Sequence, residues 1–336
     1  MYVSLLFDVE DLISTRADDD TREVAETVSS EGLRATFCVV GERVRQWRER
    51  GRNDVVDSLA RHDLGFHTDL HSVHPTVVEY LADKGWEDGV DEVLRREEAG
   101  IQAFRELFGR MPSCWGGPGN TWGPQVSEAM RRIGVPAVVY AHTRVPRGDV
   151  HRFSGILHYQ SGVSINDVEY HLADRWRSNL ERVLRDLETR AASGAEWTEL
   201  FMGHPSRIFT AEFWDGPSFS GGRNPPASEW VPPRRKPSDE AAAALRHFRD
   251  TLRAVRSLGE SSGIRVRTIA EMNALFVEAR AEVLSTQELE QAGSEIDQSL
   301  ARMPLWPILP PQIDTSRIRE LTRQRLDTLR RLRLPR

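Results

Sequence analysis

Three histidines within eight positions are the residues of this chain best suited to chemistry. His67, His71 and His74 lie in the stretch GFHTDLHSVHP, with Asp69 between the first two. If this stretch forms a helix or a tight helical turn, the four-residue spacing puts the imidazoles of His67 and His71 on one face. Two imidazoles on one face are a common way to hold a single divalent ion. The alternative is a polar turn between two helices, and the pair alone does not decide between them.

Three acids, Asp8, Glu10 and Asp11, follow the apolar run YVSLLF. Acids this close are costly to hold together unless a cation neutralises them or one stays protonated. The alternative is the start of a helix, where acids favour the positive end of the helix dipole. Cys38 and Cys114 lack a CxxC spacing, so we expect two buried thiols, and a metal site of the open, catalytic kind.

Two further groups follow apolar runs. His204 comes after LFM, where a lone histidine is usually structural, and it gains value only if it faces the same pocket as His67 and Asp8. The stretch PSCWGGPGNTWGPQ contains Trp115, Gly116, Gly117 and Trp122, which we expect to bind substrate. Glycines let the backbone approach an oxyanion, and tryptophans suit the flat faces of sugar rings. The alternative is a glycine-rich turn with two core tryptophans.

These groups need a scaffold, and the sequence predicts one in which short strands alternate with longer helices. This alternation favours a parallel sheet, and about seven or eight such units favour a (β/α) barrel, whose chemistry lies at the C-terminal ends of the strands. The expected strands are Tyr2–Phe7, Ala35–Val40, Asp63–Phe66, Pro112–Trp115, Pro136–Ala141, Gly155–Tyr159, Thr198–Met202 and Ile264–Thr268. The expected helices include Thr21–Glu31, Val90–Leu107, Pro124–Ile133, Asp174–Thr189 and Asp239–Leu258.

Two regions depart from this alternation. Residues 205–237 are rich in Pro, Gly and aromatics and too long for an ordinary connection, so we expect an ordered loop over a pocket, with Trp214 and Asp215 touching substrate. We place a catalytic barrel at residues 1–280 and a helical extension at 281–336. Its last helix, over 316–334, carries Leu321 among its apolar residues and many arginines. We expect it to pack on the barrel; binding a partner, a second copy or an anionic membrane is the alternative.

The composition excludes several classes of protein. The net charge is −6, which gives no reason to expect nucleic-acid binding, and no apolar run is long enough to span a bilayer. The start of the chain does not resemble a signal peptide. We therefore expect a cytoplasmic enzyme.

Taken in order, these groups resemble the polysaccharide deacetylases, the NodB-type carbohydrate esterases of family 4. HTDLH at His67–His71 matches the metal motif of that family, and FDVED matches its early acidic motif. PSCWGGPG resembles its proline-glycine motif, ATFCVVG one of its strands, and LFMGH its late histidine motif. The resemblance covers residues 2 to 275 and implies a distorted (β/α) barrel of about seven strands.

The resemblance also implies a mechanism, in which an N-acetyl group is hydrolysed from an amino sugar. A divalent ion would be held by His67, His71 and one acid; zinc is typical, and cobalt, nickel and iron are alternatives. Glu10 is the preferred acid and Asp11 the reserve, because residues i and i+2 of a strand share a face. Asp8 matches the catalytic base and His204 the general acid.

The chain departs from the family pattern at Gly116, where the family has an arginine that orients the base. Arg144, Arg207 and Arg223 are the candidates to replace it. His74 has no counterpart in the family, and we expect it to be structural.

We therefore expect a metal-dependent N-deacetylase that acts on an amino sugar in a glycan, a glycolipid or a sugar precursor. One alternative is another C–N amide hydrolase on the same barrel, a deformylase or an allantoinase-like amidase. The other is a degenerate barrel that only binds carbohydrate.

Overall fold

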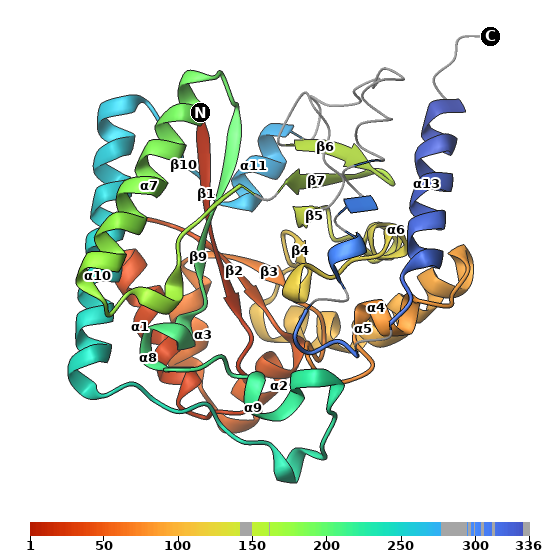
Figure 1. Cartoon of the computed structure of the whole chain (residues 1–336), viewed down its shortest axis with the longest axis horizontal. Coiled ribbons are helices and arrows are strands. Elements are labelled where there is room, and N and C mark those ends of the chain that lie inside the picture. Colours follow the sequence, from red (N-terminus) through yellow and green to blue (C-terminus); the bar gives the residue numbers. More distant parts are fainter. Residues whose placement is uncertain are drawn as a thin grey trace.

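A single ten-stranded sheet, curled and flanked by helices, forms the body of the molecule (Figure 1). This computed structural model describes residues 1–141, 150–160, 162–276, 294, 297–298, 300–303, 306–310 and 313–331. The carboxyl ends of β1, β2 and β3 point to the same edge of the sheet, and the segment around α9 lies below them in this view.

The first strand of the chain lies near the middle of the sheet. The order is β6-β7-β5-β4-β3-β2-β1-β9-β8, with β10 also paired to β1. All pairs are parallel except the β6–β7 hairpin. The strands are β1 Tyr2–Val9, β2 Thr36–Val39, β3 Asp63–Phe66, β4 Trp115–Gly116, β5 Ala137–Ala141, β6 Val150–Phe153, β7 Ile156–Gln160, β8 Val163–Ser164, β9 Trp197–Gly203 and β10 Arg265–Val266.

Side chains along each strand point alternately to the two faces of the sheet, and a separate apolar core lies on each face. On β1, Val3, Leu5 and Phe7 belong to the large core beneath the helices. Leu6 belongs to a second core, which also contains both cysteines, Cys38 and Cys114, as buried free thiols. Because successive strand residues point to opposite faces, Asp8 and Glu10 share the face of Leu6 and continue this inner stack toward the carboxyl edge.

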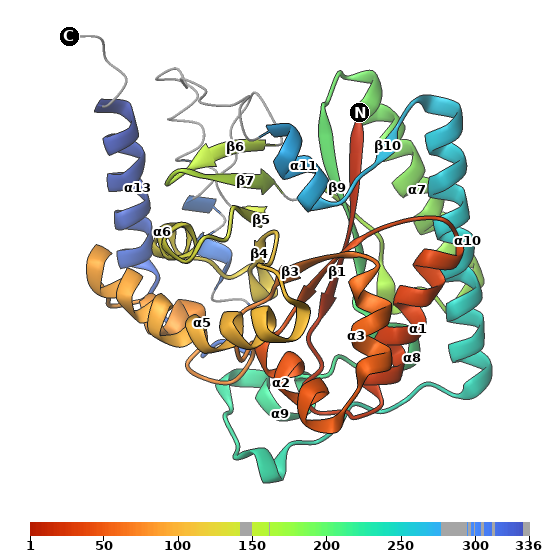
Figure 2. The same cartoon turned by 180° about the vertical axis from the view of Figure 1, so that it is seen from behind.

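The helices cover the outer face of the sheet. Figure 2 shows α1, α3 and α5 on the side seen from behind. The helix α6 has the usual sequence signals at both ends: Pro124 opens it and Gly134, with a φ of 95°, closes it. The longer helices are α1 Ala17–Ser30, α2 Gly41–Arg50, α3 Asn53–Ala60, α5 Trp86–Phe108, α6 Pro124–Ile133, α7 Ala173–Ala192, α10 Ser238–Ser262, α11 Ile269–Phe276 and α13 Ser316–Arg331. The shorter ones are α4 Val77–Leu81, α8 Pro205–Phe209 and α9 Gly216–Phe219.

The barrel-like α/β architecture is confirmed, with two differences from the expectation. All eight expected strands and all five expected helices are present, but the sheet has ten strands and its two ends are not joined by hydrogen bonds in the described residues. The additional strands, β6 and β8, are four and two residues long, too short to give a clear alternation.

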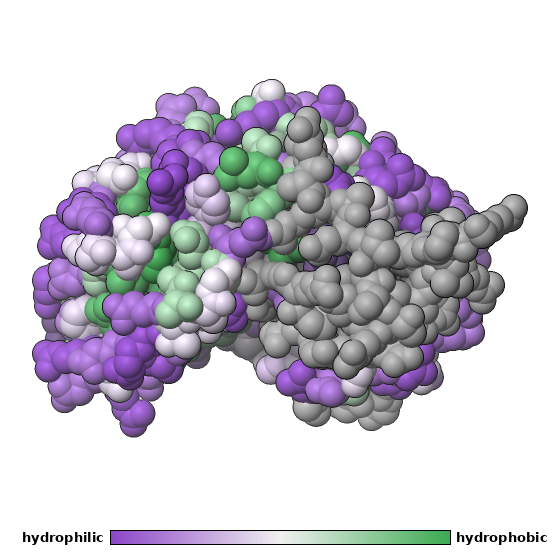
Figure 3. Space-filling view, turned by 90° about the horizontal axis from the view of Figure 1, so that it is seen from above, coloured by the Kyte–Doolittle hydropathy of each residue, from purple (hydrophilic) through white to green (hydrophobic). Residues whose placement is uncertain are grey.

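The last helix, α13, packs against α6, as expected. Ile318 and Leu321 are buried, and the guanidinium of Arg325 lies 5.1 Å from the centre of the Trp86 ring. The expected boundary at 280/281 lies outside the described residues. None of the described helices is long and apolar enough to cross a membrane. The described part of the face seen from above, at the amino end of β1, is largely hydrophilic around its rim, with an apolar area nearer its middle (Figure 3).

Candidate metal centre and active site

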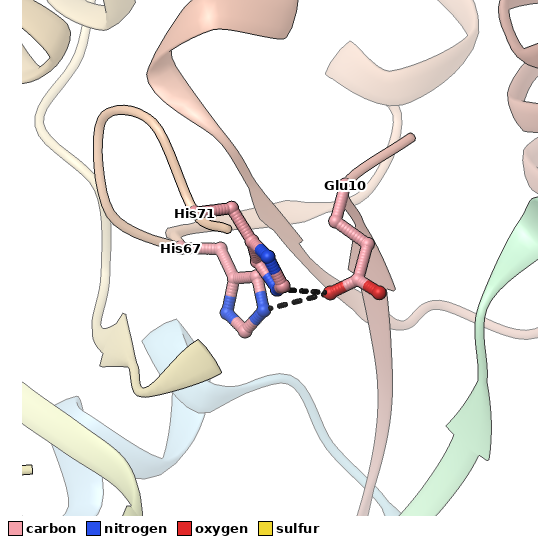
Figure 4. A group of neighbouring side chains, drawn as sticks. All are labelled: Glu10, His67 and His71. Atoms are coloured by element: carbon pink, nitrogen blue, oxygen red, sulfur yellow. Dashed lines mark hydrogen bonds and ion pairs between the residues drawn. The ribbon is translucent and has the colours of Figure 1, made fainter. Parts of the chain in front are cut away.

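One carboxylate and two imidazoles converge at the carboxyl edge of the sheet (Figure 4). Glu10 follows β1, and His67 and His71 come from the loop after β3. Oε2 of Glu10 lies 3.1 Å from Nε2 of His67 and 2.7 Å from Nε2 of His71. All three residues are buried, and their ligand atoms lie within 4.8 Å of one another. Two imidazoles and a carboxylate at such separations form an open, three-ligand site of the kind that holds a catalytic zinc.

The loop that carries the histidines is not helical, so the expected helical spacing is wrong. Thr68 and His71 have φ angles of 61° and 48°, in the left-handed region. The loop is held by its neighbours instead: the N–H of Asp69 donates to the buried carboxylate of Glu97 at 2.7 Å, and Arg45 pairs with Asp69, also at 2.7 Å. Contacts from α5 and α2, rather than a helical repeat, bring the two imidazoles together.

The tautomer of His71 favours metal binding. The hydroxyl of Ser72 donates a hydrogen bond to Oδ2 of Asp215 at 2.7 Å. The hydroxyl oxygen is therefore left to accept a hydrogen bond from the Nδ1–H of His71, 2.6 Å away. A proton on Nδ1 leaves Nε2 with a free lone pair directed at the site. Nε2 has no hydrogen-bond partner in the described structure although it is buried and close to Glu10. The residues present therefore fit a divalent ion.

The long loop contributes support to the ligands. Trp214 is buried, and its Nε1–H donates to Oε1 of Glu10 at 2.9 Å. Asp215 reaches His71 through Ser72, as described. We expected both residues to touch substrate; the geometry instead places them behind the ligands, where they orient Glu10 and His71.

Asp8 lies beside this group and is oriented by a tyrosine. The hydroxyl of Tyr140 donates to Oδ1 of Asp8 at 2.7 Å, and Nε2 of His67 lies 3.7 Å from Oδ2. Burial raises the pKa of Asp8 above its ordinary value, although the neighbouring His67 and His204 oppose the shift. Burial and the nearby Asp8 raise the pKa of Tyr140 well above its usual range, so the phenol keeps its proton.

Tyr140 is the functional group that sequence reasoning missed. Arg207 donates to the backbone of Thr210 and Arg223 to backbone carbonyls of its own loop, so neither bonds to Asp8. Arg144 lies outside the described residues. The only signal for Tyr140 in the sequence was its place at the end of an expected strand.

His204 faces the same group from β9. Its Nε2 lies 3.5 Å from Oε1 of Glu10, and its Nδ1 lies 2.7 Å from Oδ2 of Asp167. Burial would lower the pKa of His204, but Glu10 and Asp167 outweigh it and raise the pKa to about 9. Burial would raise the pKa of Asp167, but its bond to His204 lowers it. The pair is therefore an ion pair at neutral pH. Asp167 was also missed, because nothing in the sequence links it to His204.

The negative charge of the group attracts cations. Burial opposes ionisation of Glu10, yet His71 and His204 hold its pKa well below the ordinary value. Burial would lower the pKa of His67, but Asp8 and Glu10 raise it. The same acids that draw a proton to His67 also favour a metal cation.

A pocket of about 410 Å³ opens on these groups. His71, Gly117 and Glu199 are among its lining residues, with Asp8, Glu10, Gly119, Tyr140, Gly162, Ser164, Phe201, His204, Phe213 and Trp306. Glu199 is buried, and its Oε2 has no hydrogen-bond partner in the described structure. Burial and the nearby Asp8 raise the pKa of Glu199 well above its ordinary value.

Of the other predicted residues, Gly117 lines the pocket, but the two tryptophans and Asp11 do not. Trp115 and Trp122 are buried in the main core and are not among the pocket residues, so the geometry favours the turn with core tryptophans. Gly116 lies between Tyr140 and His67: an added Cβ there would come within 3.0 Å of the Tyr140 ring. Asp11 accepts the N–H groups of Ile13 and Ser14 and caps a turn.

His74 bonds to Glu79, 2.6 Å away, within the cap of α4. It is therefore a structural residue, as expected.

Among known proteins, similarity to this chain is found in solved structures. No protein-family model and no curated protein matches the chain. A candidate polysaccharide deacetylase from Mycobacterium smegmatis is similar, with 16% identity, 84% of this chain and 93% of that chain covered, and a TM-score of 0.51. A peptidoglycan N-acetylglucosamine deacetylase has 15% identity, 84% and 90% coverage and a TM-score of 0.43. A family 4 acetyl xylan esterase from Clostridium thermocellum, in complex with cobalt, has 15% identity, 82% and 91% coverage and a TM-score of 0.41.

Proposed function

We propose that this chain, which has the fold of the polysaccharide deacetylases, is a metal-dependent hydrolase that removes an N-acetyl or other N-acyl group from an amino sugar. The observation that carries the proposal is the convergence of two sets of groups on one pocket. Glu10, His67 and His71 form one set, and Asp8 and His204 join Glu10 in the other. Amide hydrolysis needs an electrophile, a base and an acid in one place, and these residues provide for all three.

Glu10, His67 and His71 would hold the ion, for which we propose zinc. When bound, a divalent ion there supplies Lewis-acid chemistry, polarising a carbonyl and acidifying water. Cobalt, nickel and iron suit the same ligands. Among the structural neighbours, the acetyl xylan esterase holds a cobalt ion.

Asp8 is the proposed base, which takes the proton of the attacking water. Tyr140 holds the carboxylate of Asp8 in a single orientation through its 2.7 Å hydrogen bond. His204 is the proposed acid, which gives its proton to the leaving amine, and Asp167 keeps it protonated and fixes its ring. Gly117 lines the pocket, and its backbone N–H is the proposed donor to the oxyanion.

The substrate is proposed to be an amino sugar in a glycan, a glycolipid or a sugar precursor. A deformylase or an allantoinase-like amidase would use the same base and acid, so a substrate screen should include formylated as well as acetylated amines. The cytoplasmic location stays a prediction.

Metal content of the purified protein is the first test. We expect about one equivalent of a divalent transition metal in the wild type and a loss of that metal in the His67→Ala/His71→Ala double variant. His74→Ala is the matched control, because this histidine lies in the same loop but bonds to Glu79; it should keep the metal.

Asp8→Asn separates the metal site from catalysis. This variant should keep the metal and lose turnover of acetylated and formylated amino sugars, because a neutral amide does not accept the proton of water. Normal turnover by Asp8→Asn would contradict the assignment of the base. Absence of metal from the wild type after repletion with zinc, cobalt or nickel would contradict the whole proposal.

A further inference from the structure

A tryptophan from the C-terminal segment lines the pocket beside the proposed metal ligands. Trp306 is half-buried and borders the pocket. Its ring lies at 75° to the ring of His71, with their centres 6.0 Å apart. The sequence motifs end at residue 275, so nothing in the expected catalytic barrel includes this side chain.

Gly119 lies directly against this ring and leaves room for it. Gly119 has a φ of 53°, and a Cβ added to it would come within 1.9 Å of Cε2 of Trp306. A side chain at position 119 and the indole of Trp306 therefore exclude each other. The glycine-rich stretch that follows β4 thus makes room for an aromatic ring from the other end of the chain.

The segment 306–310 is fixed to the long loop. The N–H of Gly221 donates to the carbonyl of Pro307 at 2.7 Å, and Pro310 packs against Gly222. Ile308 is buried in a small core with Leu12, Val40, Trp214 and Phe219. Because Trp214 also bonds to Glu10, the same small core supports both the metal ligand and the segment that carries Trp306.

We propose that Trp306 is a substrate-binding residue that stacks on the apolar face of the amino sugar, and that the C-terminal segment and the long loop together close the pocket on this side. The proposed substrate is then a short N-acylated amino sugar or the end of a glycan chain, because the described parts of the two segments bond to each other and would stop a polymer from running out of the pocket on this side. This inference rests on the proposed function and adds the substrate class to it.

The chemistry of the pocket supports this ligand. One face of a pyranose ring presents mainly C–H groups, which pack on an indole as other apolar groups do. Phe201 and Phe213 add aromatic surface, while Asp8, Glu10 and His204 provide the polar groups. A volume of about 410 Å³ is near the small end of the range that proteins use for bound small molecules.

The test compares Trp306→Ala, Trp306→Phe and the wild type, each loaded with zinc, on N-acetylglucosamine and its pentamer. We expect Trp306→Ala to raise KM for N-acetylglucosamine about tenfold, with kcat and zinc content within about twofold of the wild type. Trp306→Phe keeps an aromatic ring and should have a KM close to that of the wild type. Gly119→Ala, which displaces the indole, should raise KM similarly. Trp176→Ala is the control, since Trp176 is a partly buried tryptophan that stacks on His247 and donates to Thr251, both in α10, and is not a pocket residue.

Two results would overturn the inference while leaving the proposed function intact. One is an unchanged KM in Trp306→Ala; the other is release of several acetates from the interior of the pentamer by the wild type. Calorimetric binding of N-acetylglucosamine to the zinc-loaded proteins gives a readout that does not need turnover. Binding by the wild type that is lost in Trp306→Ala supports the inference even if no acetate is released, whereas absence of binding and of turnover in the wild type overturns both proposals.

Discussion

At the scale of single residues, the main difference from the pattern of the family that the sequence resembles is the group that orients Asp8, the proposed base. An arginine would favour the ionised form of Asp8 by charge, whereas Tyr140 offers only a hydrogen bond, and burial keeps the pKa of Asp8 raised. Glu199, which lines the same pocket as Asp8, has its pKa raised well above the ordinary value by burial and by Asp8. The pocket thus has a phenol beside Asp8 where the motif of the family that the sequence resembles has an arginine.

We expect Tyr140→Phe to keep the metal and the fold but to lower kcat by roughly tenfold to a hundredfold, because Asp8 loses the donor that fixes its orientation. Steady-state kinetics beside metal analysis would measure this. Tyr159→Phe is the matched control, since its hydroxyl bonds to Asn273, outside the pocket. Equal kcat values for Tyr140→Phe and the wild type would show that Asp8 needs no orienting donor.

At the scale of elements, the long loop over 205–237 does more than cover the pocket. Trp214 bonds directly to Glu10, and Asp215 accepts a hydrogen bond from Ser72, which bonds to His71. A loop that hydrogen-bonds to metal ligands couples its own order to the metal, since each partner restricts the other.

Trp214→Phe should therefore weaken metal binding about tenfold to a hundredfold, because the ring is kept but the hydrogen bond to Glu10 is lost. Competition with a chromogenic chelator measures the change in Kd. Trp230→Phe is the control within the same loop, because its N–H bonds to the carbonyl of Pro225 and not to a ligand. If both variants bound metal equally well, the support from the loop would be structural only.

Helix α5 holds the histidine loop through one buried acid. Burial, with Asp69 nearby, raises the pKa of Glu97 to about 8, against an ordinary value of 4.5. The folded state therefore retains a proton that the unfolded chain releases above about pH 4.5. This contribution is complete at low pH and is lost as the pH rises toward 8.

Between pH 5 and pH 8.5, the free energy of unfolding of the wild type should therefore fall, and the Glu97 carboxyl should account for up to a few kcal/mol of this fall. Each unit of difference between its folded and unfolded pKa corresponds to about 1.4 kcal/mol. Glu97→Gln, which keeps the acceptor for the N–H of Asp69, should lose this dependence and gain relative stability as the pH rises. Urea unfolding of the metal-free proteins at several pH values would measure both. Parallel pH profiles for the two proteins would contradict the raised pKa.

At the scale of the whole molecule, the sequence predicted the architecture well because the strands and helices have strong, separate periodicities. The positions of His67, His71, Asp8 and His204 at one edge followed from the rule for parallel strands. The rule did not predict the residues that support or complete the site, because each contacts it from a distant part of the chain. These residues are Tyr140, Asp167, Glu97 and Trp306. Their roles depend on tertiary geometry, which a local pattern does not contain.

The helical spacing of His67 and His71 predicted correctly that the two imidazoles lie together, but the loop that carries them is not a helix. Residues four apart meet on a helix, but here the loop brings them together through two residues with positive φ and through contacts from α2 and α5. Similarly, Trp115 and Trp122 are of a residue type that suits a sugar site, but both are buried in the main core.

The central place of β1 has a consequence for how the protein is made. The first strand leaves the ribosome long before β9 and β10, which pair with it from Trp197 and Arg265 onward. Until then one edge of a very apolar strand has no partner, and such an edge is prone to aggregate. Asp8 and Glu10 lie at the end of that strand and His204 follows β9, so the proposed active site is complete only after β9 has been made.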